Sequence, residues 1–309
     1  MPGPYPATSE GSDCRKGEQP GTPHYAAAMD VILLGTGGPL PDAHRAGPAT
    51  LVRTNGVNLL VDAGRGVLMR LAAAGLGAGQ VDAVLLTHLH SDHITDLGDL
   101  VTTRWITSFT PSPLPVFGPV GTAKHLEHLM DSLADDVSFR MAHHEDLAWN
   151  PPMTVTEVDL TSVDPVEVWR SAGDSPVVVT AGPTDHRPVH PSIGWRVEDG
   201  SASVVLAGDT VPCEGLDRLA REAGALVHTV IRKDLIAQIP IQRLLDTLDY
   251  HSSPEEAGET AQRAGVGTLV LTHFVPAPAP GELDQWTSLA ATTFSGAVVA
   301  GDDLHTVTL

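Results

Sequence analysis

The sequence is poor in cysteine and in long apolar runs. Its 309 residues include only two cysteines, Cys14 and Cys213, too few for the disulfide framework of a small secreted scaffold. No apolar run approaches the roughly 20 residues that cross a bilayer, and no charged-then-apolar signal peptide opens the chain. These absences predict a cytoplasmic protein without a membrane segment.

Basic residues are scarce as well. The chain has 18 Lys and Arg against 38 Asp and Glu, a formal net charge of −20. Such a surface repels phosphate backbones, which argues against nucleic acid as a partner without excluding a local basic patch. Acidity that only serves solubility is another explanation of the same composition. Composition leaves open whether the chain forms a homodimer.

Hydrophobic residues make up 42% of the chain, which is ordinary for a globular protein. Residues 1–28 are rich in Pro, Gly and Ser without periodicity, so we expect a disordered tail there and one domain over residues 29–309. Met29 directly precedes the first expected strand, and we hypothesise that translation begins at this residue. A peptide covering residues 1–28, found by sequencing natively expressed protein, would contradict that hypothesis.

The most informative stretch follows a buried strand predicted over Val81–Leu86. Within six positions it contains His88, His90, Asp92 and His93. Alternate residues of an extended segment point the same way, so the first two histidines can converge on one metal ion. Asp92 and His93, in the turn that follows, can face a second ion. Imidazole and carboxylate suit zinc, and also manganese or iron. A polar loop that happens to be rich in histidine is the alternative.

Matching residues recur beyond later predicted strands. Strands near Val177–Thr180, from Val204 and over Thr268–Leu271 are followed by His186, Asp209 and His273. His190 competes with His186, which we prefer because metal ligands sit best at the ends of rigid elements. Asp209 also has a second interpretation, as the N-cap of a helix.

These motifs, led by the H-x-H-x-D-H stretch, resemble the metallo-β-lactamase superfamily from Met29 onward. The loop Gly35–Pro39 and the passage Pro113–Pro119 resemble its ribonuclease Z-like and arylsulfatase-like branch. The resemblance implies an α/β (α+β) fold, a four-layer αββα sandwich with metal ions in a cleft between the sheet edges. In this arrangement we expect a helix over Ile94–Phe109. We also expect strands of the second sheet at Pro151–Val158, Val166–Arg170 and Pro176–Ala181.

The resemblance also implies a set of metal ligands for two divalent ions, most often zinc. One ion would be held by His88, His90 and His186, the other by Asp92, His93 and His273, with Asp209 bridging both. Asp62, after the strand Val57–Val61, matches a residue that holds the histidine loop rather than touching metal. A plain turn aspartate is the alternative for that position.

Two features depart from the ribonuclease Z-like pattern. Thr229 follows His228 where that pattern has a glutamate that supports a histidine acting in proton transfer. The supported histidine is present as His251, which would therefore need another partner. The long basic arm that grips tRNA is missing, because residues 232–250 are few and include only three cations. Both departures weaken tRNA as the expected substrate.

The resemblance implies a hydrolase in which two cations share a water and lower its pKa from 15.7 toward about 7, which yields a hydroxide nucleophile. We expect Asp92 and His251 to take part in catalysis, the latter by giving a proton to the leaving group. A phosphodiester or a related ester is the expected substrate. A lactonase or an arylsulfatase-like or arylesterase-like hydrolase is the alternative. A redox member is disfavoured because that branch replaces His90 with glutamate, and a non-catalytic member is disfavoured by the full ligand set.

Overall fold

The computed structural model describes residues 28–309. The tail expected over residues 1–28 lies, except for Ala28, outside the described residues. Within 28–309, none of the helices combines the length and apolar character needed to cross a bilayer.

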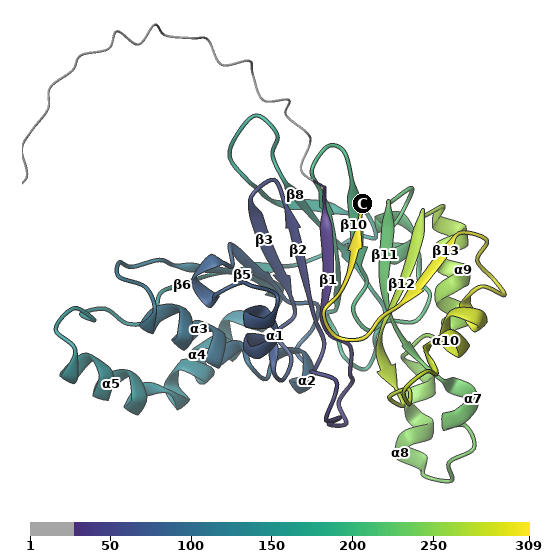
Figure 1. The fold of residues 1–309 in the computed structure, drawn as a ribbon, viewed down its shortest axis with the longest axis horizontal. Helices are drawn as coiled ribbons and strands as arrows, with labels where there is room; N and C mark the ends of the chain where they lie inside the picture. Colours follow the sequence, from purple (N-terminus) through teal and green to yellow (C-terminus); the bar gives the residue numbers. More distant parts are fainter. Residues whose placement is uncertain (1–27) are drawn as a thin grey trace, which may run out of the picture.

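Two seven-stranded sheets form the middle of the molecule (Figure 1). The first contains, in order across the sheet, β14 (His305–Thr308), β1 (Asp30–Gly35), β2 (Ala49–Thr54), β3 (Val57–Val61), β4 (Ala83–Leu85), β5 (Leu114–Pro119) and β6 (Met153–Val158). The second contains β13 (Ala297–Ala300), β12 (Thr268–Val275), β11 (Ala225–Ile231), β10 (Ser203–Leu206), β9 (Ile193–Glu198), β8 (Val178–Pro183) and β7 (Val166–Arg170). Strands β3 to β6 run parallel to one another, as do β10 to β13.

Helices cover the outer face of each sheet. The first sheet is covered by α1 (Val67–Ala73), α3 (Leu97–Ile106) and α4 (Thr122–Ser132), and the second by α6 (Glu214–Leu219), α9 (Pro254–Ala264) and α10 (Leu283–Ala290). Between the sheets lies a separate apolar core that includes the fully buried Trp195. Each sheet therefore buries both faces, which explains why its central strands are almost continuously apolar. The four-layer αββα sandwich expected from the sequence is confirmed.

The strand Met153–Val158 belongs to a different sheet from the one we expected. It pairs with β5 at the edge of the first sheet, whereas β7 and β8 lie in the second. Four of its six residues are exposed, so its own pattern carries little information about which sheet it joins.

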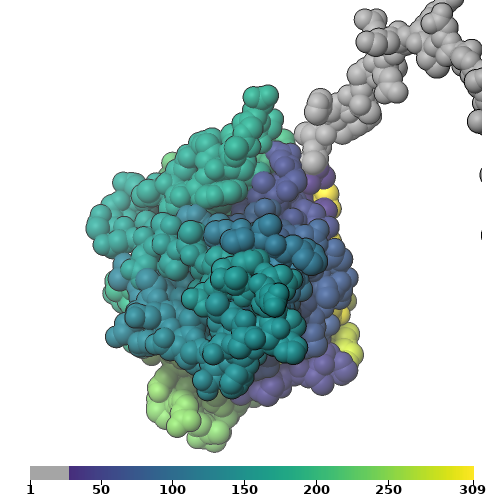
Figure 2. Space-filling view, turned by 90° about the vertical axis from the view of Figure 1, so that its left-hand side faces the viewer, coloured from purple at the N-terminus to yellow at the C-terminus, as the bar shows by residue number. Residues whose placement is uncertain are grey.

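Of the helix expected over Ile94–Phe109, the structure has only α3, Leu97–Ile106, and a separate short helix, α2 (Ser91–Ile94), precedes it. Asp92 and His93 thus lie in a short helix, not in a turn. The remaining helices are α5 (Ala134–His143), α7 (Lys233–Ile236) and α8 (Gln242–Leu245), with short 3-10 turns at Ala78–Gln80 and Asp246–Asp249. Helices α7 and α8 project from the molecule at the lower end of Figure 2 (light green).

Candidate metal centre

The predicted ligands gather at one edge of the sandwich. Residues 88–93 follow the carboxyl end of β4, and Asp62 directly follows its parallel neighbour β3. In the second sheet Asp209 follows β10, and His273 lies near the carboxyl end of β12. Since the carboxyl ends of parallel strands meet at the same edge of a sheet, these segments lie close together in space.

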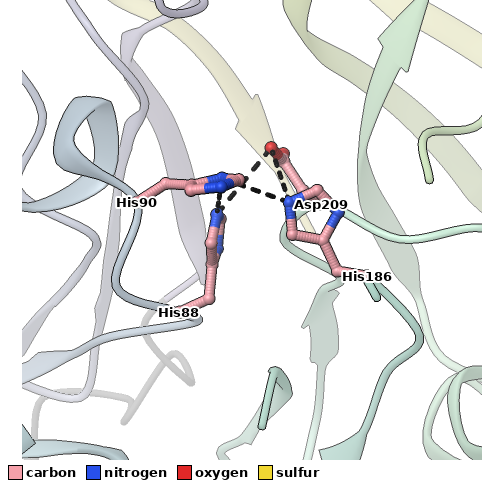
Figure 3. Close-up of side chains that lie close together, drawn as sticks. All are labelled: His88, His90, His186 and Asp209. Atoms are coloured by element: carbon pink, nitrogen blue, oxygen red, sulfur yellow. Dashed lines mark hydrogen bonds and ion pairs between the residues drawn. The ribbon is translucent and has the colours of Figure 1, made fainter. Parts of the chain in front are cut away.

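The first cluster contains His88, His90, His186 and Asp209 (Figure 3). Nδ1 of His90 lies 3.0 Å from Nε2 of His88 and 3.2 Å from Nε2 of His186. The Asp209 Oδ2 atom lies 3.9 Å from the first of those Nε2 atoms and 3.8 Å from the second. Four atoms so spaced outline a small polyhedron, and a tetrahedral zinc site with Zn–N of about 2.0–2.1 Å has edges of about 3.3 Å.

The second cluster contains Asp92, His93 and His273. Nε2 of His273 lies 3.3 Å from Asp92 Oδ2, and Nε2 of His93 lies 3.8 Å from the same oxygen. Both nitrogens also face Asp209 Oδ2, at 3.5 and 3.4 Å respectively. Asp209 therefore lies between the two clusters and contacts both.

The chemistry of these atoms fits metal ions. His93 Nε2 and Asp209 Oδ1 are buried and have no hydrogen-bond partner within residues 28–309. Leaving such groups unpaired costs about 1–3 kcal/mol each, so a native site normally supplies a partner. Both clusters are groups of imidazole nitrogens and carboxylate oxygens that can hold divalent cations.

Burial keeps the first cluster in the form that binds metal. It lowers the pKa of the imidazoles of His88, His90 and His186, that of His186 to about 4. For Asp209, burial opposes ionisation, but the nearby His273 and His93 outweigh it and hold the pKa of the carboxyl well below its usual range. Neutral imidazole and ionised carboxylate are the states that ligate cations.

In the second cluster, nearby charges and hydrogen bonds outweigh the effect of burial on the pKa values. Burial lowers the pKa of the His93 imidazole, but the carboxylates of Asp209 and Asp62 raise it well above its usual value. Burial raises the pKa of the Asp92 carboxyl, but a hydrogen bond with His273 and the charge of His93 bring it to about 2. Without a cation, the raised pKa of the His93 imidazole favours its protonated form beside these carboxylates. A bound cation would take the place of that proton.

Asp62 connects the histidines of both clusters. One of its oxygens lies 2.8 Å from Nδ1 of His93, and the same oxygen accepts a hydrogen bond from Thr87 Oγ1 at 2.9 Å. Because Thr87 Oγ1 donates to the carboxylate, it can accept from Nδ1 of His88, which lies 3.0 Å away. Both imidazoles are thereby fixed as Nδ1–H tautomers with Nε2 facing the clusters.

Two backbone carbonyls orient further histidines. Nδ1 of His186 donates to the carbonyl of Tyr250 at 2.9 Å, and Nδ1 of His251 donates to the carbonyl of Thr247 at 3.0 Å. The Nε2 atom of His251 then lies 3.3 Å from Asp209 Oδ2. Among the described residues, His251 thus contacts the Thr247 carbonyl through Nδ1 and the Asp209 carboxylate through Nε2. Sequence analysis missed both carbonyls because any residue type can supply one.

Tyr250 was also not predicted as a site residue. Its side chain is half-buried, and the centre of its ring lies 5.2 Å from that of His186 and 4.6 Å from that of His251. The ring therefore forms one wall beside the first cluster. The position of Tyr250 directly before His251 was the available signal. His190, the rival of His186, is exposed and belongs to neither cluster, whereas His186 is fully buried.

Thr229 has a structural role at the position where the ribonuclease Z-like pattern has a glutamate. Its Oγ1 donates to the carbonyl of Gly208 at 2.9 Å, next to Asp209. Gly208 has a φ of 64°, and a Cβ there would lie 2.7 Å from the Cβ of Thr87. Only glycine allows both this left-handed turn and this close approach, which brings Asp209 to the histidine loop.

Residues 57–274 match the family model described as the Beta-lactamase superfamily domain. The chain belongs to this superfamily. A protein named Ribonuclease Z from Mycolicibacterium gilvum (strain PYR-GCK) is 58% identical over 281 residues, covering 90% of this chain and 96% of the relative. A Ribonuclease Z from Mycobacterium bovis (strain BCG / Pasteur 1173P2) is 56% identical over 281 residues, covering 90% and 98%.

Solved structures share the fold of this superfamily member. The metallo-beta-lactamase fold protein YhfI from Bacillus subtilis superposes with a TM-score of 0.67 at 24% identity, covering 92% of this chain and 100% of the other. The short form of human tRNase Z superposes with a TM-score of 0.65 at 23% identity, covering 90% and 98%.

The comparisons confirm the superfamily, its ribonuclease Z-like branch and the expectation of an enzyme. The chain is a metallo-β-lactamase-fold hydrolase. One expectation conflicts with these relatives. The net charge argued against nucleic acid as a partner, yet the relatives bear the name of a ribonuclease.

Proposed function

We propose that this chain is a ribonuclease that hydrolyses phosphodiester bonds of RNA with the help of two zinc ions. The observation that carries the proposal is the 56–58% identity to proteins named Ribonuclease Z over nearly their whole length. The two adjoining histidine-rich clusters support it, because paired cations suit the attack on a phosphodiester.

In this proposal His88, His90 and His186 would hold one ion, and Asp92, His93 and His273 would hold the other. Asp209, whose Oδ2 faces both clusters, would contribute to both sites. The nitrogen-rich ligand set favours zinc over magnesium or calcium, although manganese or iron would also accept it. When bound, such a pair of ions lowers the pKa of a shared water and offsets negative charge that develops on the phosphate.

The chain's own residues position the reacting groups. Asp62 and the carbonyl of Tyr250 hold three of the imidazoles in one tautomer, so that their Nε2 atoms need no reorganisation. Asp92, whose pKa is about 2, stays ionised through the working pH range. With Nδ1–H bonded to the carbonyl of Thr247, His251 would give a proton to the leaving oxygen from Nε2 in its imidazolium form and keep the Nδ1 proton.

The test uses the purified protein loaded with zinc. It is offered a precursor tRNA, bis-p-nitrophenyl phosphate, an aryl sulfate, an aryl ester and a lactone. We expect cleavage of the precursor at defined positions. Turnover of the sulfate or the lactone alone would overturn the proposal.

Ligand variants test the site itself. His88→Ala or Asp209→Ala should lower RNA cleavage at least about 100-fold, since a bound metal supplies several kcal/mol of transition-state stabilisation. Both should also lower the metal content measured by elemental analysis. His186→Ala and the exposed control His190→Ala form a matched pair, and loss of metal in only the latter would show that the assignment is wrong.

A further inference from the structure

We propose that three unpaired basic side chains, Arg65, Lys124 and Arg243, form a surface around the metal centre that binds the RNA phosphate backbone. This inference rests on the proposed function and says which part of an acidic protein contacts its substrate. Below, these three residues are called the basic rim.

Most cations of the described chain are already neutralised. Ten Lys and Arg side chains form ion pairs with carboxylates. Arg53 and Arg104 instead donate to backbone carbonyls. Within residues 28–309, four exposed cations have neither an ion pair nor a side-chain hydrogen bond: Arg65, Lys124, Arg221 and Arg243. A paired cation contributes little field at a distance, so these four dominate the attraction of an anion.

Topology places the basic rim at the metal edge. Arg65 lies four residues after β3, in the loop that begins with Asp62, and Lys124 lies in α4, directly after β5. Strands β3 and β5 run parallel to β4 on either side of it, and β4 leads into the histidine stretch. Both cations therefore leave the first sheet at the same edge as His88.

The third rim residue comes from the second sheet. Arg243 lies in α8, which follows the carboxyl end of β11, between the strands that lead to Asp209 and His273. Arg221 precedes the amino end of β11 and so lies toward the opposite edge. Figure 1 shows α4, α2 and α8 along the lower side of the molecule, with the histidine-bearing α2 between the other two.

Acidic groups near the basic rim form hydrogen bonds, but none forms an ion pair with a rim residue among the described residues. Asp246, beside Arg243, accepts a hydrogen bond from Gln242 at 2.7 Å, and Asp96, near Arg65, accepts from the backbone nitrogen of Gly66. Glu157 accepts from the backbone nitrogens of Gly121 and Ala123, next to Lys124. These carboxylates keep their charge, but the rim side chains themselves are free to contact an external anion. A polyanion that spans the metal centre would contact several of them at once, whereas a small ester would reach few.

Charge reversal provides the test. The zinc-loaded variants Arg65→Glu, Lys124→Glu and Arg243→Glu are compared with Arg221→Glu, which makes the same change of charge at the opposite edge. The dissociation constant for a precursor tRNA is measured across a salt series, together with the ratio of RNA turnover to bis-p-nitrophenyl phosphate turnover.

Each rim variant should weaken RNA binding several-fold and lower that turnover ratio. It should also reduce the slope of log affinity against log salt by about 0.7 to 1, the value of one phosphate contact. The Arg221→Glu control should change the RNA affinity, the turnover ratio and the salt slope less than any rim variant does. Metal content and thermal melting verify folding, and if a glutamate variant misfolds, the corresponding glutamine variant should give a smaller effect in the same direction.

Two results would overturn the proposal that the basic rim binds RNA. Equal weakening by Arg221→Glu would mean that only overall charge matters. Rim variants indistinguishable from wild type would mean that other groups contact RNA. Failure of the proposed function gives a different result, since wild-type protein would then neither bind nor cut RNA while still hydrolysing the small ester.

Discussion

At the scale of single residues, Asp62 acts on both metal clusters although it belongs to neither. It contacts His93 directly and reaches His88 through the hydroxyl of Thr87. It has a φ of 60°, an uncommon conformation for a residue other than glycine, and lies directly after β3. Both the backbone conformation of Asp62 and the hydrogen bonds of its carboxylate thus serve to hold the two histidines in place.

We expect Asp62→Asn to weaken metal binding about 10- to 100-fold, because an amide has only one acceptor oxygen. It cannot both accept from the Thr87 backbone nitrogen, as Oδ1 does at 2.8 Å, and accept from Thr87 Oγ1 and His93, as Oδ2 does. Zinc affinity measured by competition with a chromogenic chelator checks this. Asp199→Asn is the matched control, since Asp199 is also a buried carboxylate that accepts hydrogen bonds, from Thr54 and Ser201. Wild-type zinc affinity in Asp62→Asn would contradict the role of this residue.

His228 is a fully buried histidine outside both clusters. Its Nδ1 donates to the carbonyl of Thr229 at 2.7 Å, and its Nε2 has no partner among the described residues. Burial lowers the pKa of this imidazole below its usual value of about 6.5. Between the lowered pKa and about 6.5 the unfolded chain binds a proton that the folded chain does not, so stability falls as the pH falls through that window.

The variant His228→Leu should therefore gain stability relative to wild type as the pH is lowered from 7 to 5. The gain is bounded by one proton, about 1.4 kcal/mol per pH unit. Urea unfolding of both proteins at several pH values measures the difference. A difference that stays constant with pH would show that this imidazole does not titrate on unfolding.

The side chains that we propose as metal ligands could be selected from the sequence because each residue type and spacing limits the chemistry. His88, His90 and Asp92 follow one predicted strand, and the structure brings them together with the later residues as expected. The carbonyls of Tyr250 and Thr247 could not be predicted, since a backbone group leaves no trace in the choice of amino acid.

At the scale of elements, α9 has a complete N-terminal cap two residues after His251. The hydroxyl of Ser253 accepts from the backbone nitrogen of Glu256 at 3.2 Å, and the Glu256 carboxylate accepts from the backbone nitrogen of Ser253 at 2.8 Å. Lys233 of α7 forms an ion pair with the same carboxylate at 2.7 Å. The cap therefore joins α9 to the segment that precedes it.

Replacing the capping hydroxyl in Ser253→Ala should lower the free energy of unfolding by about 1 kcal/mol. Equilibrium denaturation measures it. Ser253→Asn, which retains a capping oxygen, should remain close to wild type. If the two variants are equally destabilised, the loss comes from packing and not from the cap.

The break between α2 and α3 shows why local patterns failed for some elements. The carbonyl of His93 accepts from the backbone nitrogen of Ala63 at 2.7 Å, and the nitrogen of Asp96 donates to the carbonyl of Ala63 at 3.0 Å. These tertiary hydrogen bonds use backbone groups that a continuous helix would have used itself. The sequence predicted helical residues there, but not a competing partner thirty residues away.

At the scale of the whole molecule, the two clusters join the two sheets. His88, His90, Asp92 and His93 come from the first sheet, whereas the other ligands come from the second: His186, Asp209 and His273. Ions bound there would cross-link the layers at one edge, where apolar packing between the sheets ends. Binding to the folded state alone stabilises it by mass action.

Removing metal with a chelator should therefore lower the melting temperature by at least about 5 °C. Zinc at 100 times its dissociation constant contributes about 2.7 kcal/mol, and a protein of this size shifts by roughly 2–4 °C per kcal/mol. Differential scanning calorimetry with and without chelator measures the shift. Asp209→Ala should show a much smaller one, and a full shift in that variant would place the stabilising ion elsewhere.

The overall layers were predictable because the ligand motifs resemble the metallo-β-lactamase superfamily, a resemblance that implies the four-layer sandwich. Strand β14 was not, since three of its four residues are exposed and its pattern resembles a loop. It pairs antiparallel with β1, from Asp30 opposite Thr308 to Leu33 opposite His305. The last residues of the chain thereby complete the sheet that the first described strand belongs to (Figure 1).

This closure sets an order of events during protein synthesis. A ribosome releases the amino-terminal strands first, so β1 emerges long before the strand that covers its edge. Until residues 305–308 leave the exit tunnel, that edge offers unpaired backbone groups to any other extended chain. The nascent protein can therefore complete its first sheet only once β14 has emerged.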